Sequence, residues 1–268
     1  MTTRLEAPAQ EPRNVYGDGS GEVHLAGVAR AFGGVRALDG VDFDVAPHEI
    51  VAVVGPSGCG KTTLLELVCG LQQPDAGTVR GDRAVLMPQR DGLLPWLSAI
   101  DNAALAPRLA GASRDDARAR AHPLFAAFGL EGFERARPHE LSGGMRQRVA
   151  FLRTLLSGKS VLCLDEPFGA LDALTRREMQ DWLAQALERE PRTVLLVTHD
   201  VEEAARLAHR VLVMSPRPGR MVAELPVPAT RREAEVIAVR EQAMKALRSS
   251  PPTPEPGSQP PGGETPWA

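Results

Sequence analysis

The chain has 268 residues, of which 43% are hydrophobic and 24% charged, and its formal net charge at pH 7 is -3. This composition is typical of a globular protein with one large core, or one core and a subdomain. The slightly acidic balance does not supply the basic surface that nucleic-acid backbones require, so a nucleic-acid partner is unsupported. The three cysteines show no CxxC spacing, which disfavours a disulfide framework or a zinc site and indicates reduced thiols. No apolar run approaches the roughly 20 residues of a membrane-spanning helix, and the first residues lack the apolar stretch of a secretory signal.

Composition divides the chain into a core and two tails. Residues 1–21 and 249–268 are rich in Pro, Gly, Ser and polar residues, which cannot bury enough apolar area to offset the entropy of ordering, so both predict disordered tails. Residues 22–220 carry the apolar patterns of a folded domain. Residues 221–248 predict a C-terminal helical extension.

Two kinds of strand pattern occur in the core. The sequences "VHLAGVARAF" (23–32) and "VDFDV" (41–45) alternate apolar and polar residues, which predicts a half-exposed antiparallel flap. Continuous apolar runs, which suit a parallel sheet covered on both faces, occur at 49–54, 83–89, 160–167, 192–200 and 209–215. Residues from about 91 to 157 contain no strand pattern and include two helical ones, 113–130 and 142–158. We therefore predict an α/β core with an antiparallel β subdomain and an inserted helical subdomain.

The sequence "GPSGCGKTT" lies between the first parallel strand and a helical pattern, and it fits the phosphate-loop motif G-x-x-x-x-G-K-[ST]. Its glycines let backbone N–H groups face phosphate oxygens at a helix N-terminus, where the helix dipole also favours anions. The motif predicts a P-loop NTPase (RecA-like) core that binds a nucleotide. The alternative, a glycine-rich turn that binds nothing, is disfavoured by the complete motif in its strand-loop-helix context. The candidate nucleotide-binding residues are Gly55, Pro56, Ser57, Gly58, Cys59, Gly60, Lys61, Thr62 and Thr63.

Individual roles follow from the chemistry of the motif. Lys61 is expected to reach the β- and γ-phosphates, and the hydroxyl of Thr62 to bind Mg²⁺. Thr63 is expected to contact the α-phosphate. For Cys59, it is sufficient to interpret the residue as a small side chain that fits a tight turn.

The string "QRDGLLPW" (89–96) follows the second parallel strand and places apolar side chains beside a charge pair. One interpretation is that Leu93, Leu94 and Trp96 form a docking surface for another protein. The other is that Trp96 packs in the core of the helical subdomain.

"VLCLDEP" places Asp165 and Glu166 at the end of a buried strand, where open α/β sheets place their ligand sites. Adjacent carboxylates there are costly unless a cation lies near, and Mg²⁺ held by Thr62 and Asp165 would supply it. Glu166 is then expected to orient and deprotonate the attacking water. A solvated acidic turn is the alternative. His199 ends another apolar strand at the same edge, within reach of a γ-phosphate, although a lone histidine is more often structural.

The segment "LSGGMRQRVA" (141–150) resembles the signature motif of ATP-binding cassette (ABC) proteins. Together with the phosphate loop, Gln89, "DEP", "GALD" (169–172) and His199, in this order, it extends the resemblance over about residues 22–220. The resemblance implies ATP binding and hydrolysis with Mg²⁺. Met145 departs from the family pattern, which has glutamine at this position. The substitution is expected to leave activity intact, because the serine hydroxyl, backbone N–H groups and the helix N-terminus meet the γ-phosphate in this family, and it weakens any role for a side-chain amide there.

Further roles are implied by the resemblance at matching positions. Phe32 would stack on adenine, although a core phenylalanine on a strand is the alternative. Gln89 would contact Mg²⁺ and link the core to the helical subdomain. His199 would be the switch histidine. Four further residues would meet the ATP of a second copy in a head-to-tail homodimer, and these are Ser142, Gly143, Gly144 and Asp172.

Within the family, "QRDGLLPWLSAIDN", "EPFGALDALTR" and "MSPRPGR" resemble the ATPase subunits of the nitrate/sulfonate/taurine importer group. This resemblance implies integral-membrane permease partners docking near Leu93, Leu94 and Trp96. It also implies an extracytoplasmic solute-binding protein that acts indirectly, and a peripheral location on the cytoplasmic face of the membrane. Import of a thiamine-precursor pyrimidine or a similar metabolite is an alternative. A soluble ABC ATPase without a transport role is another.

Overall fold

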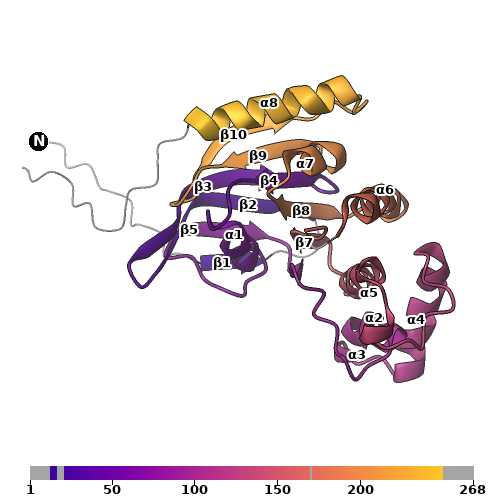
Figure 1. Ribbon diagram of the computed structural model, residues 1–268. Coiled ribbons are helices and arrows are strands. Elements are labelled where there is room, and N and C mark those ends of the chain that lie inside the picture. The colour runs from indigo at the N-terminus through magenta and orange to yellow at the C-terminus, as the bar shows by residue number, and fades with distance from the viewer. Residues whose placement is uncertain (1–12, 17–20, 170, 250–268) are drawn as a thin grey trace, which may run out of the picture.

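The computed structural model describes residues 13–16, 21–169 and 171–249, which form two β-sheets and a set of surrounding helices (Figure 1). The larger sheet has six strands in the order β10-β9-β4-β8-β7-β6. All neighbouring pairs in it are parallel except β9 and β10. Its strands are β4 (Ile50–Val54), β6 (Ala84–Met87), β7 (Val161–Asp165), β8 (Thr193–Thr198), β9 (Arg210–Met214) and β10 (Met221–Pro226).

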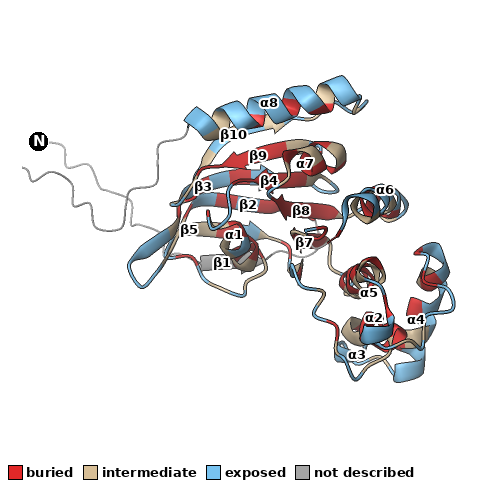
Figure 2. Cartoon of the chain, in the orientation of Figure 1, coloured by how far each residue is buried: buried red, intermediate tan, exposed pale blue. Residues whose placement is uncertain are grey.

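The continuous apolar runs form the centre of this sheet because both of its faces are covered. In β7, Leu162 and Leu164 join one buried cluster, whereas Val161 and Cys163 join the other. Successive side chains of a strand point to opposite faces, so a strand buried on both faces has no exposed positions and is mostly apolar. Figure 2 shows this continuous burial along β8 and β9.

The smaller sheet has four strands in the order β1-β5-β2-β3. β2 pairs antiparallel with β3 and β5, and β1 pairs parallel with β5. The buried residues of this sheet share a cluster with the helix α1 (Lys61–Val68) and one face of the six-stranded sheet. The strands are β1 (Arg13–Tyr16), β2 (Val23–Phe32), β3 (Val35–Val45) and β5 (Ala76–Gly81).

The chain between β6 and β7 is helical, as predicted, and its helices lie together at the lower right of Figure 1. Ser98, Ser113 and Ser142 each accept a hydrogen bond from a backbone N–H in the first turn of a helix, which fixes three of the helix starts. The fold is that of a P-loop NTPase with an antiparallel β subdomain and a helical insertion, as the sequence predicted. The inserted helices are α2 (Ala99–Ala103), α3 (Leu105–Leu109), α4 (Arg114–Ala127) and α5 (Gly143–Leu155).

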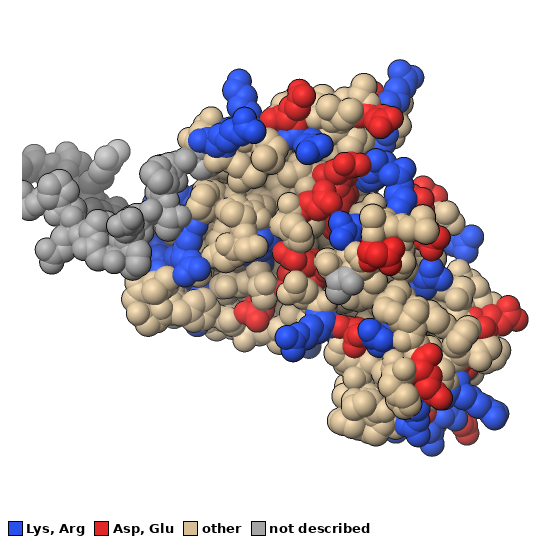
Figure 3. All heavy atoms as spheres, viewed as in Figure 1, with Lys and Arg blue, Asp and Glu red and all other residues tan. Residues whose placement is uncertain are grey.

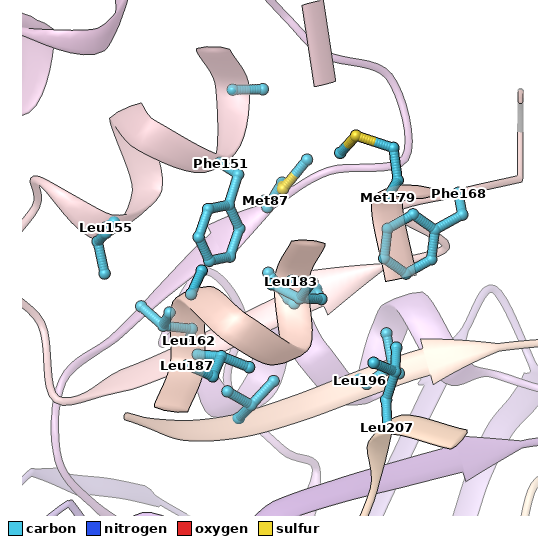
Figure 4. Close-up of a cluster of buried hydrophobic side chains, with 14 of the residues drawn as sticks. Met87, Phe151, Leu155, Leu162, Phe168, Met179, Leu183, Leu187, Leu196 and Leu207 are labelled. Atoms are coloured by element: carbon cyan, nitrogen blue, oxygen red, sulfur yellow. The ribbon is translucent and has the colours of Figure 1, made fainter. Parts of the chain in front are cut away.

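The remaining helices cover the other face of the six-stranded sheet. They are α6 (Ala173–Arg189), α7 (Val201–Leu207) and α8 (Glu233–Ser249). Side chains from α5, α6 and α7 meet the sheet in one buried cluster, drawn in Figure 4. Trp182 of α6 packs edge-on against Phe128 and Phe151, with ring centroids 4.6 and 5.2 Å apart. The helical insertion is thereby packed against the core rather than only tethered to it.

The structure corrects two of the predicted segments. Residues 13–16, predicted to lie in a disordered tail, form β1, because β5 offers them an open edge with which to pair. Residues 221–226, predicted as part of a helical extension, form β10 and widen the core sheet. The helix of this region begins only at Glu233. Gly21 is also among the described residues, and Ser249, predicted to lie in the second tail, ends α8. The rest of the predicted tails, 1–12, 17–20 and 250–268, lies outside the described residues.

Two of the strands, β5 and β10, had weak sequence patterns. β5 contains two glycines and only one buried residue, Val79. β10 lies at the edge of its sheet and has no fully buried residue. Among the helices of the described residues, none is long and apolar enough to cross a membrane.

One buried carboxylate joins α2 to α4. Asp101 is 3% exposed, and its carboxylate accepts bonds from Arg118 Nε at 2.8 Å and Arg114 Nη2 at 2.9 Å. The Ser98 hydroxyl donates to it as well. The Arg118 guanidinium is the main cause that holds the pKa of this carboxyl well below its usual value of 3.8. The buried charge is therefore stabilised by its neighbours.

We expect Asp101→Asn to lower the free energy of unfolding by about 2 kcal/mol at pH 7, because a charged hydrogen-bonding partner of two arginines is lost. A lowered pKa in the folded state means that this stabilisation is complete above the ordinary aspartate pKa and is lost as the pH falls below it. Urea unfolding of the parent and the variant at pH 7 and at pH 3 measures both effects. The control is Asp181→Asn, which removes an exposed i,i+4 pair with Arg177 and should change stability by less than about 0.5 kcal/mol. A difference that stays constant at acid pH would contradict this account.

Candidate functional site

The phosphate loop connects the end of β4 to the start of α1. Gly58 and Gly60 have φ angles of 76° and 111°, in the left-handed region that favours glycine. At Gly55 a Cβ would lie 2.7 Å from the carbonyl oxygen of Met214. The loop therefore needs glycine at these three positions to turn tightly between the strand and the helix.

Lys61 points its ammonium group back into this loop. Its Nζ donates to the carbonyl oxygen of Gly55 at 2.8 Å and to that of Pro56 at 3.1 Å. The residue is 6% exposed. A buried lysine whose bonds go only to neutral carbonyls is suited to bind an anion, since a phosphate would compensate its charge better.

The Thr62 hydroxyl and the Asp165 carboxylate lie side by side. Thr62 Oγ1 donates to Asp165 Oδ2 at 2.9 Å. Burial is the main cause that raises the pKa of Asp165; the bond from Thr62 opposes it, and the charge of Glu166 adds to it. A carboxylate that loses solvation in this way is stabilised by a nearby divalent cation, and hydroxyl and carboxylate oxygens are ligands that Mg²⁺ accepts.

Protein side chains alone do not complete a metal site here. Within the described ranges, no group of three or more His, Cys, Asp and Glu residues could hold a metal ion. Mg²⁺ usually keeps several waters and takes its remaining ligands from substrate phosphates. The pair formed by Thr62 and Asp165 fits this mode of binding.

Three of the predicted residues meet at Glu166. Its Oε2 accepts from Gln89 Nε2 at 3.2 Å and lies 3.2 Å from His199 Nδ1. Glu166 has a φ angle of 43°, an uncommon conformation for a residue other than glycine. Such backbone strain is concentrated at functional sites. The carboxylate thus lies at the end of β7 with one neighbour from the loop after β6 and one from the end of β8.

With the exception of His199, these side chains line one cavity of about 600 Å³. Phe32, at the end of β2, lies at its wall with 43% of the residue exposed. The Arg30 guanidinium lies 4.8 Å from the centre of the Phe32 ring. This exposure contradicts the alternative of a core phenylalanine. The lining residues are Phe32, Val35, Ala37, Ser57, Gly58, Gly60, Lys61, Thr62, Thr63, Gln89, Asp165, Glu166 and Arg217.

Cys59 is turned away from this cavity. Its side chain is buried in the cluster between the two sheets, and burial is the main cause that raises the pKa of its thiol. The residue therefore packs the loop against the core, as a small residue in a tight turn would.

The signature residues lie elsewhere. Ser142 accepts from the N–H of Met145 at 3.2 Å at the start of α5, and a Cβ at Gly144 would lie 3.0 Å from Thr175 Cγ2. Asp172 accepts from the N–H groups of Leu174 and Thr175 at the start of α6, both at 3.1 Å. Neither segment lines the nucleotide cavity of its own chain. Among the described residues, most of the predicted site therefore lies together in the nucleotide cavity. The signature residues and Asp172 lie outside this cavity.

The string 89–96 divides between core and surface. Leu93 is 8% exposed and belongs to the main cluster, so it is not part of a docking surface. Leu94 is half-buried, and its backbone is bonded to the side chain of the buried Asn102. Trp96 is 67% exposed, which contradicts the interpretation that it packs in the core. Of the three candidate docking residues, only Trp96 is exposed.

Trp96 borders an open groove of about 760 Å³ on the helical insertion. Figure 3 shows basic side chains, with acidic ones among them, over this part of the molecule. Asp101 is already paired with Arg114 and Arg118. The charged lining residues of the groove are Asp101, Arg114, Arg118, Glu134, Arg135 and Arg137, with His122 beside them.

The chain between Gln89 and Leu93 is bound to α5. Arg146 Nε donates to Asp91 Oδ2 at 3.0 Å. Arg153 donates to the carbonyl oxygens of Gly92 and Asp91 at 2.8 and 2.7 Å. The sequence did not indicate these anchors, because arginines on a helical pattern are typical of an exposed face. Arg217 in the nucleotide cavity was missed too, since its turn lies far from the phosphate loop in sequence.

Comparison with known proteins agrees with this geometry. Residues 38–169 match the model of the family described as ABC transporter. The chain is 45% identical over 226 residues to the taurine import ATP-binding protein TauB of Rhizobium johnstonii, with 81% of this chain and 84% of the relative covered. It is 44% identical over 229 residues to the protein of the same name from Burkholderia thailandensis, with 82% and 86% covered.

A solved structure shares the fold. It is an ATP-binding cassette in a dimeric post-hydrolysis state with bound ADP and phosphate, 28% identical to this chain. The superposition has a TM-score of 0.67 and covers 77% of this chain and 99% of the other. Motifs, cavity, relatives and fold agree, and the chain belongs to the ABC transporter family, in the group of ATP-binding subunits that includes the taurine import proteins.

Proposed function

We propose that this chain is the ATP-hydrolysing subunit of an importer for a small solute of the nitrate, sulfonate and taurine type. The observation that carries the proposal is the position of Glu166. Its carboxylate is held between Gln89 and His199 at the rim of a cavity that is also lined by most residues of the phosphate loop. Close relatives named as taurine import proteins favour this solute class over a pyrimidine.

ATP binds across this cavity with its triphosphate on the phosphate loop and its adenine on Phe32. The N–H groups of the loop and the start of α1 face the phosphates, and the helix dipole adds favourable charge. Lys61 exchanges its bonds with the loop carbonyls for bonds to the β- and γ-phosphates. The half-exposed ring of Phe32 offers a flat apolar face on which a base can stack.

Thr62 and Asp165 would hold Mg²⁺, with Gln89 as a further oxygen ligand. When bound with ATP, Mg²⁺ supplies positive charge at the β- and γ-phosphate oxygens. The raised pKa of Asp165 returns toward its usual value when a cation is close. Gln89 would then link the state of the bound nucleotide to the segment that follows it in sequence.

Glu166 accepts the proton of the attacking water. Its place at the end of β7 is fixed by the bond from its N–H to the carbonyl oxygen of Val197, at 2.8 Å. His199 lies on the other side of the carboxylate and contacts the γ-phosphate. The contact between His199 and Glu166 keeps both groups at the cavity edge until the nucleotide arrives.

A second copy of the chain completes the site. Ser142, Gly143, Gly144 and Asp172 lie outside the cavity of their own chain, so we infer that they act on the ATP of the partner in a head-to-tail homodimer. The solved cassette that this chain resembles is dimeric. ATP is then hydrolysed when the two chains close over it, so hydrolysis depends on the movement of one chain toward the other.

The groove beside Trp96 is the proposed docking site for a cytoplasmic helix of an integral-membrane permease. An exposed tryptophan at the edge of an open groove is typical of an interface anchor. The basic lining favours a partner with acidic side chains. In this arrangement the chain lies peripherally on the cytoplasmic face of the membrane, and an extracytoplasmic solute-binding protein acts on it only through the permease.

We expect Glu166→Gln to keep ATP affinity and to lower the rate of hydrolysis by about 10²- to 10⁴-fold, the range for a lost acid–base group. Measuring ATP binding by calorimetry and phosphate release by a steady-state assay separates the two effects. The control is Glu202→Gln, which removes a carboxylate paired with Arg206 on α7, outside the cavity, and should hydrolyse ATP at the parent rate. Near-normal turnover of the Glu166→Gln protein would remove this residue from the mechanism.

We expect Trp96→Ala to weaken binding to the permease by about 10- to 100-fold, as loss of an interface tryptophan does, while leaving ATP binding and the melting temperature nearly unchanged. Solute uptake and ATPase activity are measured in proteoliposomes that contain the cognate permease. Leu109→Ala, at an 81% exposed residue of the same insertion that is not part of the groove, is the control. Leu93→Ala should instead lower the melting temperature, because Leu93 is buried. Normal uptake by the Trp96→Ala protein would contradict the proposed docking site.

A further inference from the structure

The turn between β9 and β10 brings one arginine to the phosphate loop. Arg217 donates from Nε to the carbonyl oxygen of Gly58 at 3.1 Å. Its Nη2 would lie 3.1 Å from a Cβ built at Gly58. It is also a lining residue of the cavity that contains Lys61 and Glu166. A segment about 160 residues away in sequence thus adds a cation to the nucleotide site.

Backbone contacts hold this turn against the loop. The Gly219 N–H donates to the carbonyl oxygen of Ala37 at 2.9 Å, and the Asp39 N–H donates to that of Gly219 at 3.0 Å. A Cβ at Gly219 would lie 2.3 Å from the carbonyl oxygen of Cys59. This close approach requires glycine, and it places the preceding residues of the turn directly beside the phosphate loop.

The turn is also stiff within itself. Pro216 and Pro218 flank Arg217 and fix their own φ angles. The Ser215 hydroxyl lies 2.9 and 3.0 Å from the carbonyl oxygens of the two prolines and donates its one hydrogen toward them. The backbone of Arg217 therefore loses little freedom when its side chain binds a ligand, which lowers the entropic cost of binding.

The neighbouring arginines of the hairpin are used differently. Arg210 is paired with Glu49, and Arg220 with Asp39. Arg217 instead contacts a neutral main-chain carbonyl, as Lys61 does in the same cavity. A guanidinium that is exposed and bonded to a neutral acceptor gains more from a phosphate oxygen than an arginine that already has a carboxylate.

We propose that Arg217 is a further nucleotide-binding residue, whose guanidinium contacts the polyphosphate of the nucleotide. The planar fork of N–H donors matches phosphate oxygens. Phe32 supplies the flat apolar surface that a base requires. The guanidinium of Arg217 is therefore better matched to the phosphates, which are the charged part of the ligand. The proposal rests on the proposed function, because it concerns the same nucleotide cavity.

The test compares ligands that differ only in their number of phosphates. ADP, AMP and adenosine are titrated into the parent protein, Arg217→Ala, Arg217→Lys and Arg220→Ala by calorimetry. We expect Arg217→Ala to weaken ADP binding by about tenfold, the low end for an exposed charge-assisted contact, and AMP binding by less, with adenosine unchanged. Arg217→Lys should recover part of the loss. Arg220→Ala removes the same charge from the same turn and should bind ADP like the parent.

Three results would overturn the inference. The first is ADP binding by Arg217→Ala at the parent affinity. The second is an equal loss for ADP and adenosine, which would mean that Arg217 acts on the base or on the shape of the loop. The third is an equal loss in Arg220→Ala, which would indicate a general effect of charge. If the parent protein bound no ADP, the proposed function would fail with it, whereas a parent that binds ADP and an unchanged Arg217→Ala would remove only this inference.

Discussion

The site depends on how the adjacent carboxylates of Asp165 and Glu166 are kept in place at the end of a buried strand. β7 is buried along its whole length, so Asp165, its last residue, loses most of the solvation of its charge. Different contacts offset this cost for each residue. Thr62 bonds to Asp165, while Gln89 and His199 hold Glu166. Thr62 lies in the first turn of α1, Gln89 in the loop after β6 and His199 just after β8, so the order of elements around the sheet assembles the site.

The parallel sheet also explains why the two halves of the predicted machinery lie apart. β4, β7 and β8 are neighbours in the sheet, so their carboxyl ends share one edge. The start of α5, with Ser142, belongs to the helical insertion and does not line the nucleotide cavity of its own chain. For this reason we propose that a second chain, related head to tail, brings its Ser142 to the ATP.

Sequence patterns predicted the core of the fold and most of the cavity, because both depend on local signals. A complete phosphate loop marks the end of the strand that precedes it. An apolar run that is followed by polar residues marks a strand end in the same way. The patterns did not predict β5 and β10, since both strands bury few residues. β5 buries only Val79, and β10, at the edge of its sheet, has no fully buried residue. They also could not separate Leu93 from Trp96, whose burial depends on the packing of the whole insertion. Arg217 depends on tertiary contacts alone and leaves no local signal.

The anchoring of the chain after Gln89 has a consequence for how such proteins diversify. Arg153 holds this segment by the carbonyl oxygens of Asp91 and Gly92, and Asn102 holds it by the backbone of Leu94. Main-chain groups are the same whatever the side chain, so the link tolerates changes of residue. The groove and the nucleotide cavity share no lining residue. Substitutions in the proposed docking surface can therefore accumulate without changing any residue that lines the nucleotide cavity.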